Sequence, residues 1–160
     1  MPGVSGMAVT LAELEQAACR ELGTSGWHEV TQQQIDLFAE ATGDRQWIHV
    51  DPEAAAKGPF GTTVAHGYLT LSMLPMMLSE IVSVTDATMG VNYGTEKIRF
   101  TSPVPSGSRV RLNAKLVRAE RRGASVVWTV GVRVEIEGED KPALVGEVVY
   151  MATGVGAPRS

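Results

Sequence analysis

Two titratable side chains in the segment ATGDRQWIHVDP, residues 41–52, are of the types that general acid–base chemistry uses. Asp44 and His49 are five residues apart, and an irregular backbone over that distance can turn both side chains toward one point. Trp47 and Ile48 between them offer apolar cover, which strengthens electrostatic interactions. In the alternative interpretation, Asp44 stabilises a turn and His49 is a half-buried loop residue. Because Asp is common in turns, the spacing alone favours this alternative.

The other acidic residue of this segment and the first histidine of the chain have different expected roles. Asp51 directly precedes Pro52, so it is the natural N-cap of a short helix that reaches Ala56 and ends at Lys57. We therefore assign Asp51 a structural role. His28 lies in a short strand without an acidic neighbour of interest, and we expect it to be a surface or packing residue.

The tripeptide Ala65-His66-Gly67 opens the longest mainly apolar segment, which we expect to be a buried helix over residues 67–83. The first N–H groups of a helix lack intrahelical acceptors. A glycine lets a substrate carbonyl approach the N–H of Gly67, and the helix dipole favours the charge that develops on its oxygen. The alternative is a glycine that packing or the turn requires. His66 is either a third catalytic group or a hydrogen-bonded structural residue.

The rest of the sequence offers little other catalytic chemistry. The three histidines and the single cysteine, Cys19, lack the spacing of a zinc site. A nucleophile elbow, a Walker loop and a dinucleotide-binding glycine fingerprint are all missing. We therefore expect acid–base work by Asp and His without a metal or a cofactor.

Composition and length indicate one soluble domain. The 160 residues include 44% hydrophobic ones and have a net charge of −4, which gives no general attraction for nucleic acid or anionic membranes. We expect a single domain over residues 9–154, with flexible ends over residues 1–8 and 155–160. The N-terminal segment lacks the pattern of a secretory signal, and a lone cysteine fits a reducing compartment, so a cytoplasmic protein is expected.

Periodicity and capping residues predict the elements before the apolar helix. Residues 9–22 have apolar residues at helical spacing, and Gly23 follows as a stop. A short strand is expected over residues 27–31. Thr31 and Gln34 have the spacing of a capping box that begins the next helix.

Four segments rich in Val, Thr and alternating apolar residues follow the apolar helix: residues 88–101, 107–120, 124–138 and 142–153. Long strands joined by tight turns indicate an antiparallel meander. A sheet wrapped around the helix of residues 67–83 buries both apolar surfaces, so the predicted class is α+β. We expect Pro75 to bend that helix. The helix face expected against the sheet consists of Tyr68, Leu71, Leu74, Pro75 and Leu78.

Three motifs, taken together, resemble one protein family. The segments A-T-G-D-x-Q-x-I-H-x-D-P, F-G-T-T-V-A-H-G-Y-L-T-L-S and N-Y-G-x-x-K-I-R-F-x-x-P-V are similar to the MaoC-like dehydratases, among them the (R)-specific enoyl-CoA hydratases. The resemblance covers about residues 25–152. It implies the hot dog fold, in which an antiparallel β-sheet wraps a long central α-helix. It also implies a homodimer, with the acyl-CoA site near the subunit interface.

By position, the resemblance implies that Asp44 and His49 are the catalytic pair and that the backbone N–H of Gly67 receives the thioester oxygen. With this resemblance, the catalytic interpretation of Asp44 and His49 replaces the interpretation as a turn and a loop residue. Several relatives carry a serine where this chain has Pro75, and Ser72, one turn earlier, is not assumed to replace it. The residues expected in the substrate pocket are Trp47, Ile48, His66 and Ser72.

The implied activity is the reversible hydration of a trans-2-enoyl-CoA to an (R)-3-hydroxyacyl-CoA, without a metal or a redox cofactor. Three alternatives stay open. One is a hot dog acyl-CoA thioesterase, for which the central helix offers only Glu80 as a carboxylate. The others are a carrier-protein-linked 3-hydroxyacyl dehydratase and a non-catalytic acyl-binding subunit.

Overall fold

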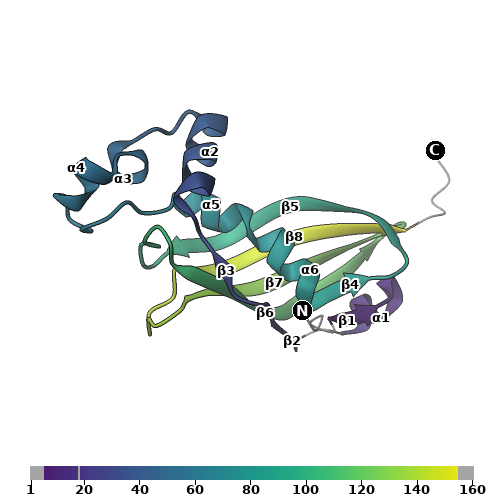
Figure 1. Cartoon of the computed structure of the whole chain (residues 1–160). Helices are drawn as coiled ribbons and strands as arrows, with labels where there is room; N and C mark the ends of the chain where they lie inside the picture. The colour runs from purple at the N-terminus through teal and green to yellow at the C-terminus, as the bar shows by residue number, and fades with distance from the viewer. Residues whose placement is uncertain (1–5, 18, 155–160) are drawn as a thin grey trace.

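A long antiparallel sheet, with helix α6 lying against one face, forms most of the molecule (Figure 1). The computed structural model describes residues 6–17 and 19–154. In chain order the elements are β1 (Met7–Val9), α1 (Leu11–Gln16), β2 (Arg20–Thr24), β3 (His28–Glu29), α2 (Gln32–Thr42), α3 (Trp47–Val50), α4 (Pro52–Ala56), α5 (Gly67–Ser72), α6 (Leu74–Ile81), β4 (Val82–Val84), β5 (Ala87–Phe100), β6 (Arg109–Arg122), β7 (Ser125–Ile136) and β8 (Leu144–Gly154). The predicted α+β class and the four long strands are therefore confirmed.

The main sheet has the strand order β2-β6-β7-β8-β5, and β3 also pairs with β6. Strands β6, β7 and β8 are consecutive antiparallel neighbours, as a meander requires. Strand β5 pairs with β8 rather than with β6, so the predicted meander is wrong at its first step. The connection over residues 101–108 is too long for a tight hairpin and contains Pro103 and Pro105, and it carries the chain across the end of the sheet.

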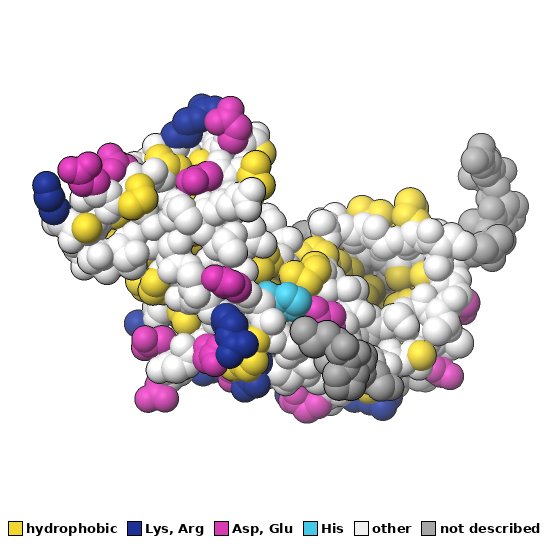
Figure 2. Space-filling model, viewed as in Figure 1, with side chains coloured by type: hydrophobic (Ala, Val, Ile, Leu, Met, Phe, Trp, Pro, Cys, Tyr) yellow, Lys and Arg dark blue, Asp and Glu magenta, His cyan; other side chains and the backbone are white. Residues whose placement is uncertain are grey.

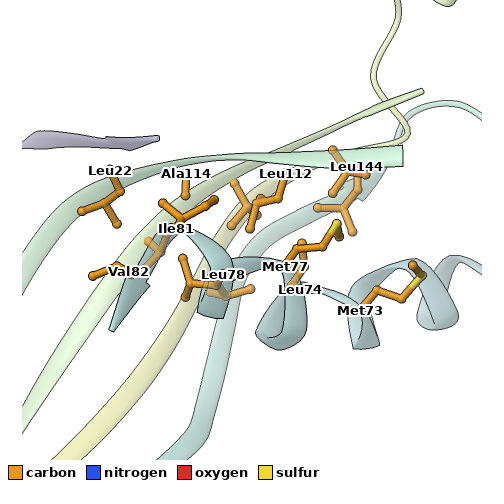
Figure 3. Packing of buried hydrophobic residues seen from close by; sticks show 14 of the residues in the cluster. Leu22, Met73, Leu74, Met77, Leu78, Ile81, Val82, Leu112, Ala114 and Leu144 are labelled. Atoms are coloured by element: carbon orange, nitrogen blue, oxygen red, sulfur yellow. The ribbon is translucent and has the colours of Figure 1, made fainter. Parts of the chain in front are cut away.

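Helix α6 and the facing strands share one apolar core (Figure 3). The helix buries Leu74, Met77, Leu78 and Ile81, and Leu74 and Met77 are 0% exposed. The strand side chains that are fully buried include Leu112, Leu116, Val130, Val134 and Leu144. Each buried Leu or Met contributes about 1.5–3 kcal/mol relative to leaving it exposed. This contact holds the helix on the sheet and confirms the expected wrapping.

The helix expected over residues 67–83 is divided into α5, α6 and strand β4. The break falls at Met73, and Pro75 lies in the first turn of α6, where its missing N–H costs little, so the expected bend is confirmed. Residues Val82–Val84 pair in parallel with β1 instead of continuing the helix. Two residues predicted to lie on the helix face against the sheet do not do so: Pro75 is exposed, and Tyr68 is 68% exposed.

The helix expected over residues 9–22 is wrong beyond its first turns. Helix α1 ends at Gln16, and β2 follows as an antiparallel neighbour of β6. Leu22 is the one buried residue of β2, so its helical spacing from the leucines of α1 is coincidental. Gly23 lies in a bulge of that strand with a φ of 138°, and it does not end a helix.

The N-terminal segment joins the fold earlier than expected. Strand β1 pairs with β4, so the prediction that residues 1–8 are flexible is wrong for residues 7 and 8. Residues 1–5 and 155–160 lie outside the described part of the chain. Within residues 6–17 and 19–154, none of the helices is both long and apolar enough to cross a membrane.

Helices α2, α3 and α4 form a lobe beyond one end of the sheet (Figure 1). Thr31 and Gln34 make the predicted capping box of α2, and Gly43 ends that helix in the left-handed conformation with a φ of 82°. The side chain of Asp51 accepts the N–H of Ala54 at 3.0 Å, so its predicted role as the N-cap of α4 is confirmed. The segment between these caps was expected to be irregular, but it contains the helical turn α3.

Candidate active site

The end of α2 and the single turn of α3 bring Asp44 and His49 to the same region. The two environments differ, since His49 is 7% exposed and Asp44 is exposed. The prediction that Trp47 shields this pair from solvent is wrong, because Trp47 is 44% exposed. Its ring lies against Gly58, where an added Cβ would be 2.8 Å from the nearest ring atom. Ile48 is half-buried.

The hydrogen bond of His49 determines which of its ring nitrogens can act as a base. Nδ1 lies 2.7 Å from the carbonyl oxygen of Val64. Because a carbonyl only accepts, Nδ1 carries the proton in the neutral ring and Nε2 is unprotonated. The Nε2 lone pair can therefore accept a proton from a water or a substrate. A second bond, from the N–H of Val64 to the carbonyl of Ile48 at 3.0 Å, holds α3 against this loop.

His66 joins the two predicted catalytic residues. It is 3% exposed, and its Nε2 lies 2.9 Å from the carbonyl oxygen of Asp44, so Nε2–H is the donor. Its ring stacks on that of His49, with centroids 3.8 Å apart and planes at 22°. The ring of Phe38 packs against His66 at 4.9 Å between centroids. The structure thus assembles Asp44, His49 and His66 around one point.

Asp44, His49 and His66 each offer a carboxylate oxygen or a ring nitrogen, and these atoms lie within 4.8 Å of one another. One water that makes two hydrogen bonds of about 2.8 Å can bridge such a gap. With Nδ1 of His49 and Nε2 of His66 carrying the protons of the bonds just described, Nε2 of His49 and Nδ1 of His66 each keep a lone pair. These lone pairs and the Asp44 carboxylate can accept the hydrogen bonds of a water, and their types also occur in metal sites. Metal-free chemistry stays a prediction.

Two residues that the sequence did not single out hold α3 in place. The amide Nε2 of Gln32 donates to the carbonyl of His49 at 2.8 Å. The hydroxyl of Thr63, which is 3% exposed, donates to Oε1 of Gln32 at 2.6 Å. The side chain of Gln32 thus connects α2 by hydrogen bonds both to α3 and to the loop that carries Val64. Sequence patterns do not separate Gln32 from its two glutamine neighbours.

Gly67 is the first residue of α5, directly after the stacked ring of His66. Within the described part of the chain, its N–H has no hydrogen-bond acceptor. A Cβ added at Gly67 would lie 2.8 Å from the ring of Phe100, so packing alone already favours glycine here. The packing interpretation is therefore supported, and the role of the N–H in binding a substrate oxygen stays a prediction.

The two interpretations of Gly67 predict different outcomes for a double variant. Gly67→Ala should destabilise the protein by about 1–3 kcal/mol because of the clash with Phe100. In a Phe100→Ala background the clash is gone, so the added Gly67→Ala should leave the melting temperature unchanged. We expect the catalytic activity to stay at least about tenfold lower in the double variant than in Phe100→Ala, because the methyl group would displace a substrate carbonyl from the N–H. Equal activity of these two variants would leave packing as the whole reason for the glycine.

A groove runs between α5 and α6 on one side and β5 and β8 on the other. It consists of two adjoining cavities of about 290 and 390 Å³, which share Pro75, Asn92 and Tyr150. Hydrophobic side chains gather in this hollow (Figure 2). Ser72 lines the smaller cavity, and its hydroxyl donates to the carbonyl of Tyr68 at 2.7 Å. Burial raises the pKa of Tyr150 to about 12, so its hydroxyl stays protonated at neutral pH. The groove suits an elongated apolar ligand.

The carboxylate of α6 is engaged in a structural contact. Oε1 of Glu80 lies 2.6 Å from Nε2 of His28, and Oε2 accepts the N–H of Gly26 at 2.9 Å. The expectation that His28 has no acidic neighbour is therefore wrong, because its partner comes from a distant part of the sequence. These two contacts hold Gly26 and the first residue of β3, His28, against α6.

The fold and the site place this chain in a known family. Residues 13–137 match the family described as a MaoC-like domain. The protein belongs to the MaoC-like family, and its fold is the hot dog fold. The 3-hydroxyacyl-thioester dehydratase Z of Mycobacterium tuberculosis is 50% identical over 141 residues, which are 88% of this chain and 93% of that protein. Nodulation protein N of Rhizobium leguminosarum is 51% identical over 139 residues, 85% of this chain and 86% of that one.

A solved structure agrees with this placement at the level of the fold. The unliganded R-hydratase PhaJ1 of Pseudomonas aeruginosa superposes with a TM-score of 0.72 and 22% identity, and the match covers 95% of this chain and 93% of that one. Together with the dehydratase relative, family membership makes this protein a hydro-lyase.

Proposed function

We propose that this hydro-lyase catalyses the reversible hydration of a trans-2-enoyl-CoA to an (R)-3-hydroxyacyl-CoA. The observation that carries the proposal is the gap of at most 4.8 Å between the carboxylate of Asp44 and a ring nitrogen of His49, which one water can bridge. The unprotonated Nε2 of His49 provides a base, and the N–H of Gly67, which has no acceptor among the described residues, follows His66 directly. The name of the M. tuberculosis relative, a 3-hydroxyacyl-thioester dehydratase, supports the same reaction class.

In the proposed mechanism, Asp44 and His49 hold one water over C3 of the substrate. Nε2 of His49 accepts a proton as the water oxygen bonds to C3. The π electrons of the double bond move toward the thioester, and the N–H of Gly67 stabilises the resulting enolate oxygen. The proton then passes from the pair to C2, so that the elements of one water are added. The thioester itself acidifies the position at C2, and the reaction needs no redox step.

The acyl chain is proposed to occupy the groove beside α5 and α6. The groove has an apolar lining and adjoins the helix whose first residue is Gly67, so a thioester at that N–H can extend its chain along the helices. Acyl-CoA and acyl-carrier thioesters share this part of the substrate. A hydration assay with both carriers over a chain-length series, with the chirality of the product determined, is the direct test. Failure to hydrate any enoyl thioester would contradict the proposal.

We propose that two copies of the chain pair along β5. This strand is the last in the sheet order and pairs only with β8 among the described residues. Its exposed apolar side chains include Met89, Val91 and Tyr93, which are 53%, 37% and 56% exposed. A long unpaired edge with apolar side chains favours pairing with another strand. Such pairing would form a homodimer with the groove near its interface.

A charge placed on this edge tests the dimer. Val91→Glu is expected to convert a dimer into a monomer in light scattering, because a carboxylate would be buried without a partner at the interface. Lys115→Glu, which places a carboxylate at an exposed position of the interior strand β6, is the control and should leave the mass unchanged. A dimeric Val91→Glu protein, or a monomeric parent, would contradict pairing along β5.

The thioesterase alternative is weaker, because the carboxylate of Glu80 already contacts His28 and Gly26. Release of free CoA from a saturated acyl-CoA would favour it nevertheless. A non-catalytic acyl-binding subunit would bind acyl-CoA tightly without turnover. The proximity of Asp44 and His49, with Gly67 directly after His66 in the chain, favours hydration over both alternatives.

A further inference from the structure

His66 has an unusual position for a histidine. It precedes the first residue of α5, but its side chain makes no capping hydrogen bond to that helix. The side chain is almost fully buried, and among the described residues its Nδ1 has no hydrogen-bond partner. A buried polar atom without a partner destabilises a fold. The unpartnered Nδ1 therefore lowers stability, and the contacts of the rest of the side chain must offset this loss.

The contacts of His66 connect three groups that are distant in the sequence. Its Nε2–H donates to the carbonyl of Asp44, so it holds the backbone of the loop between α2 and α3. Its ring covers one face of the His49 imidazole at 3.8 Å. Its own backbone continues directly into Gly67. His66 therefore influences the relative positions of the Asp44 carboxylate, the His49 imidazole and the backbone N–H of Gly67.

We propose that His66 is a positioning residue for hydration, and that its Nε2–H bond to the carbonyl of Asp44 is the contact that matters most. The inference rests on the proposed function, which it deepens. The bond places the Asp44 carboxylate at the distance from His49 that one water can bridge. The other contacts of the loop after Gly43 are short-range: the N–H of Arg45 donates to the carbonyl of Gly43 at 3.1 Å, and Arg45 pairs with Glu40 at 3.0 Å. The carboxylate of Asp44 itself accepts only the N–H of Gln46 at 3.4 Å among the described residues. His66 acts through Asp44 and His49 and transfers no proton itself.

Two substitutions at His66 test the Nε2–H donor and the aromatic ring separately. In His66→Gln the amide nitrogen stands as many bonds from Cα as Nε2 of histidine, so it can donate to the carbonyl of Asp44. In His66→Phe the aromatic ring remains, but the donor is lost. We expect His66→Phe to lower kcat by about 10–10²-fold with little change in KM, since misplacement of a catalytic group by about 1 Å has effects of this size. His66→Gln should recover most of that loss.

Controls and a second measurement complete the test. His28→Gln and His28→Phe make the same chemical changes at a histidine that contacts Glu80 on α6, and they should leave kcat unchanged. Since the chain has three histidines, ring ¹H–¹⁵N correlation spectra can identify each tautomer. His66 is expected with its proton on Nε2, and a proton on Nδ1 instead would overturn the proposed bond.

The remaining outcomes distinguish the two proposals. If the parental chain hydrates an enoyl thioester and His66→Phe does so at the same kcat, the positioning role is wrong and the proposed function stands. Equal losses in His66→Phe and His66→Gln would also overturn the role of the donor. If the parental chain hydrates no enoyl thioester, the proposed function fails, and the positioning role in hydration fails with it.

Discussion

Asp44→Asn is expected to lower kcat/KM for enoyl thioester hydration by about 10²–10⁴-fold, the usual effect of losing a general acid or base. An amide retains an oxygen that can accept the N–H of Gln46, so the local backbone should be preserved. It cannot accept a proton, and its NH₂ group would orient a bridging water differently from a carboxylate. Because Asp44 is exposed, the melting temperature should stay close to that of the parental protein. Steady-state kinetics with a short enoyl-CoA and a thermal melt measure both effects.

The matched control for this substitution lies in the same segment. Asp51 caps α4 by accepting the N–H of Ala54, and asparagine is about as good an N-cap as aspartate. Asp51→Asn should therefore preserve both stability and hydration. If Asp44→Asn hydrates the substrate at the parental rate, like Asp51→Asn, then Asp44 is not part of the reaction. Similar losses in both variants would indicate damage to the segment as a whole.

Local features of the fold could be predicted from the sequence because the interacting residues are close in the chain. The capping box of Thr31 and Gln34 spans three residues, and so does the cap from Asp51 to Ala54. Hydrophobic alternation similarly indicates β7, where residues 126, 128, 130, 132, 134 and 136 are buried. Val127 and Thr129 at the alternate positions are buried as well, so burial alternates only in the second half of the strand. In each case the side chains and the backbone they stabilise lie within one or two turns or one strand.

Pairings between distant segments could not be predicted in this way. Periodicity describes β5 correctly as a strand, but it contains no information about whether β6 or β8 lies beside it. Leu22 has helical spacing from Leu14 and yet lies in a strand, because pairing with β6 outweighs a weak local preference. The contact between His28 and Glu80 arises for the same reason, since the fold brings α6 to the segment before β3.

The sequence predicts which residues contribute to the candidate site, but not how their side chains contact one another. The sequence suggests Asp44, His49 and Gly67, but the spacing cannot show that His66 stacks on His49 or donates to the backbone of Asp44. Both contacts depend on how the lobe of α2–α4 folds back on the start of α5. Gln32 was missed because its hydrogen bonds to the carbonyl of His49 and from the hydroxyl of Thr63 join groups that only the folded chain brings together.

His49→Asn is expected to abolish most of the hydration activity, by about 10²–10⁴-fold in kcat, while the protein stays folded. The amide nitrogen of asparagine stands as many bonds from Cα as Nδ1 of histidine, so it can still donate to the carbonyl of Val64, which Nδ1 now contacts at 2.7 Å. What disappears is the Nε2 lone pair, which is the base in the proposed mechanism. Kinetics over the same substrate series, together with a thermal melt, measure the two consequences separately.

His49→Gln provides the complementary case. Its amide nitrogen corresponds to Nε2, so the bond to Val64 is lost and a buried carbonyl oxygen loses its donor, which costs about 1–3 kcal/mol. The melting temperature should then fall by about 2–4 °C for each kcal/mol, whereas that of His49→Asn should fall less. Both variants should lose about 10²–10⁴-fold in kcat, because neither amide can accept a proton. Hydration at the parental rate by His49→Asn would mean that the base is a different group and that His49 serves only to hold α3 against the loop of Val64.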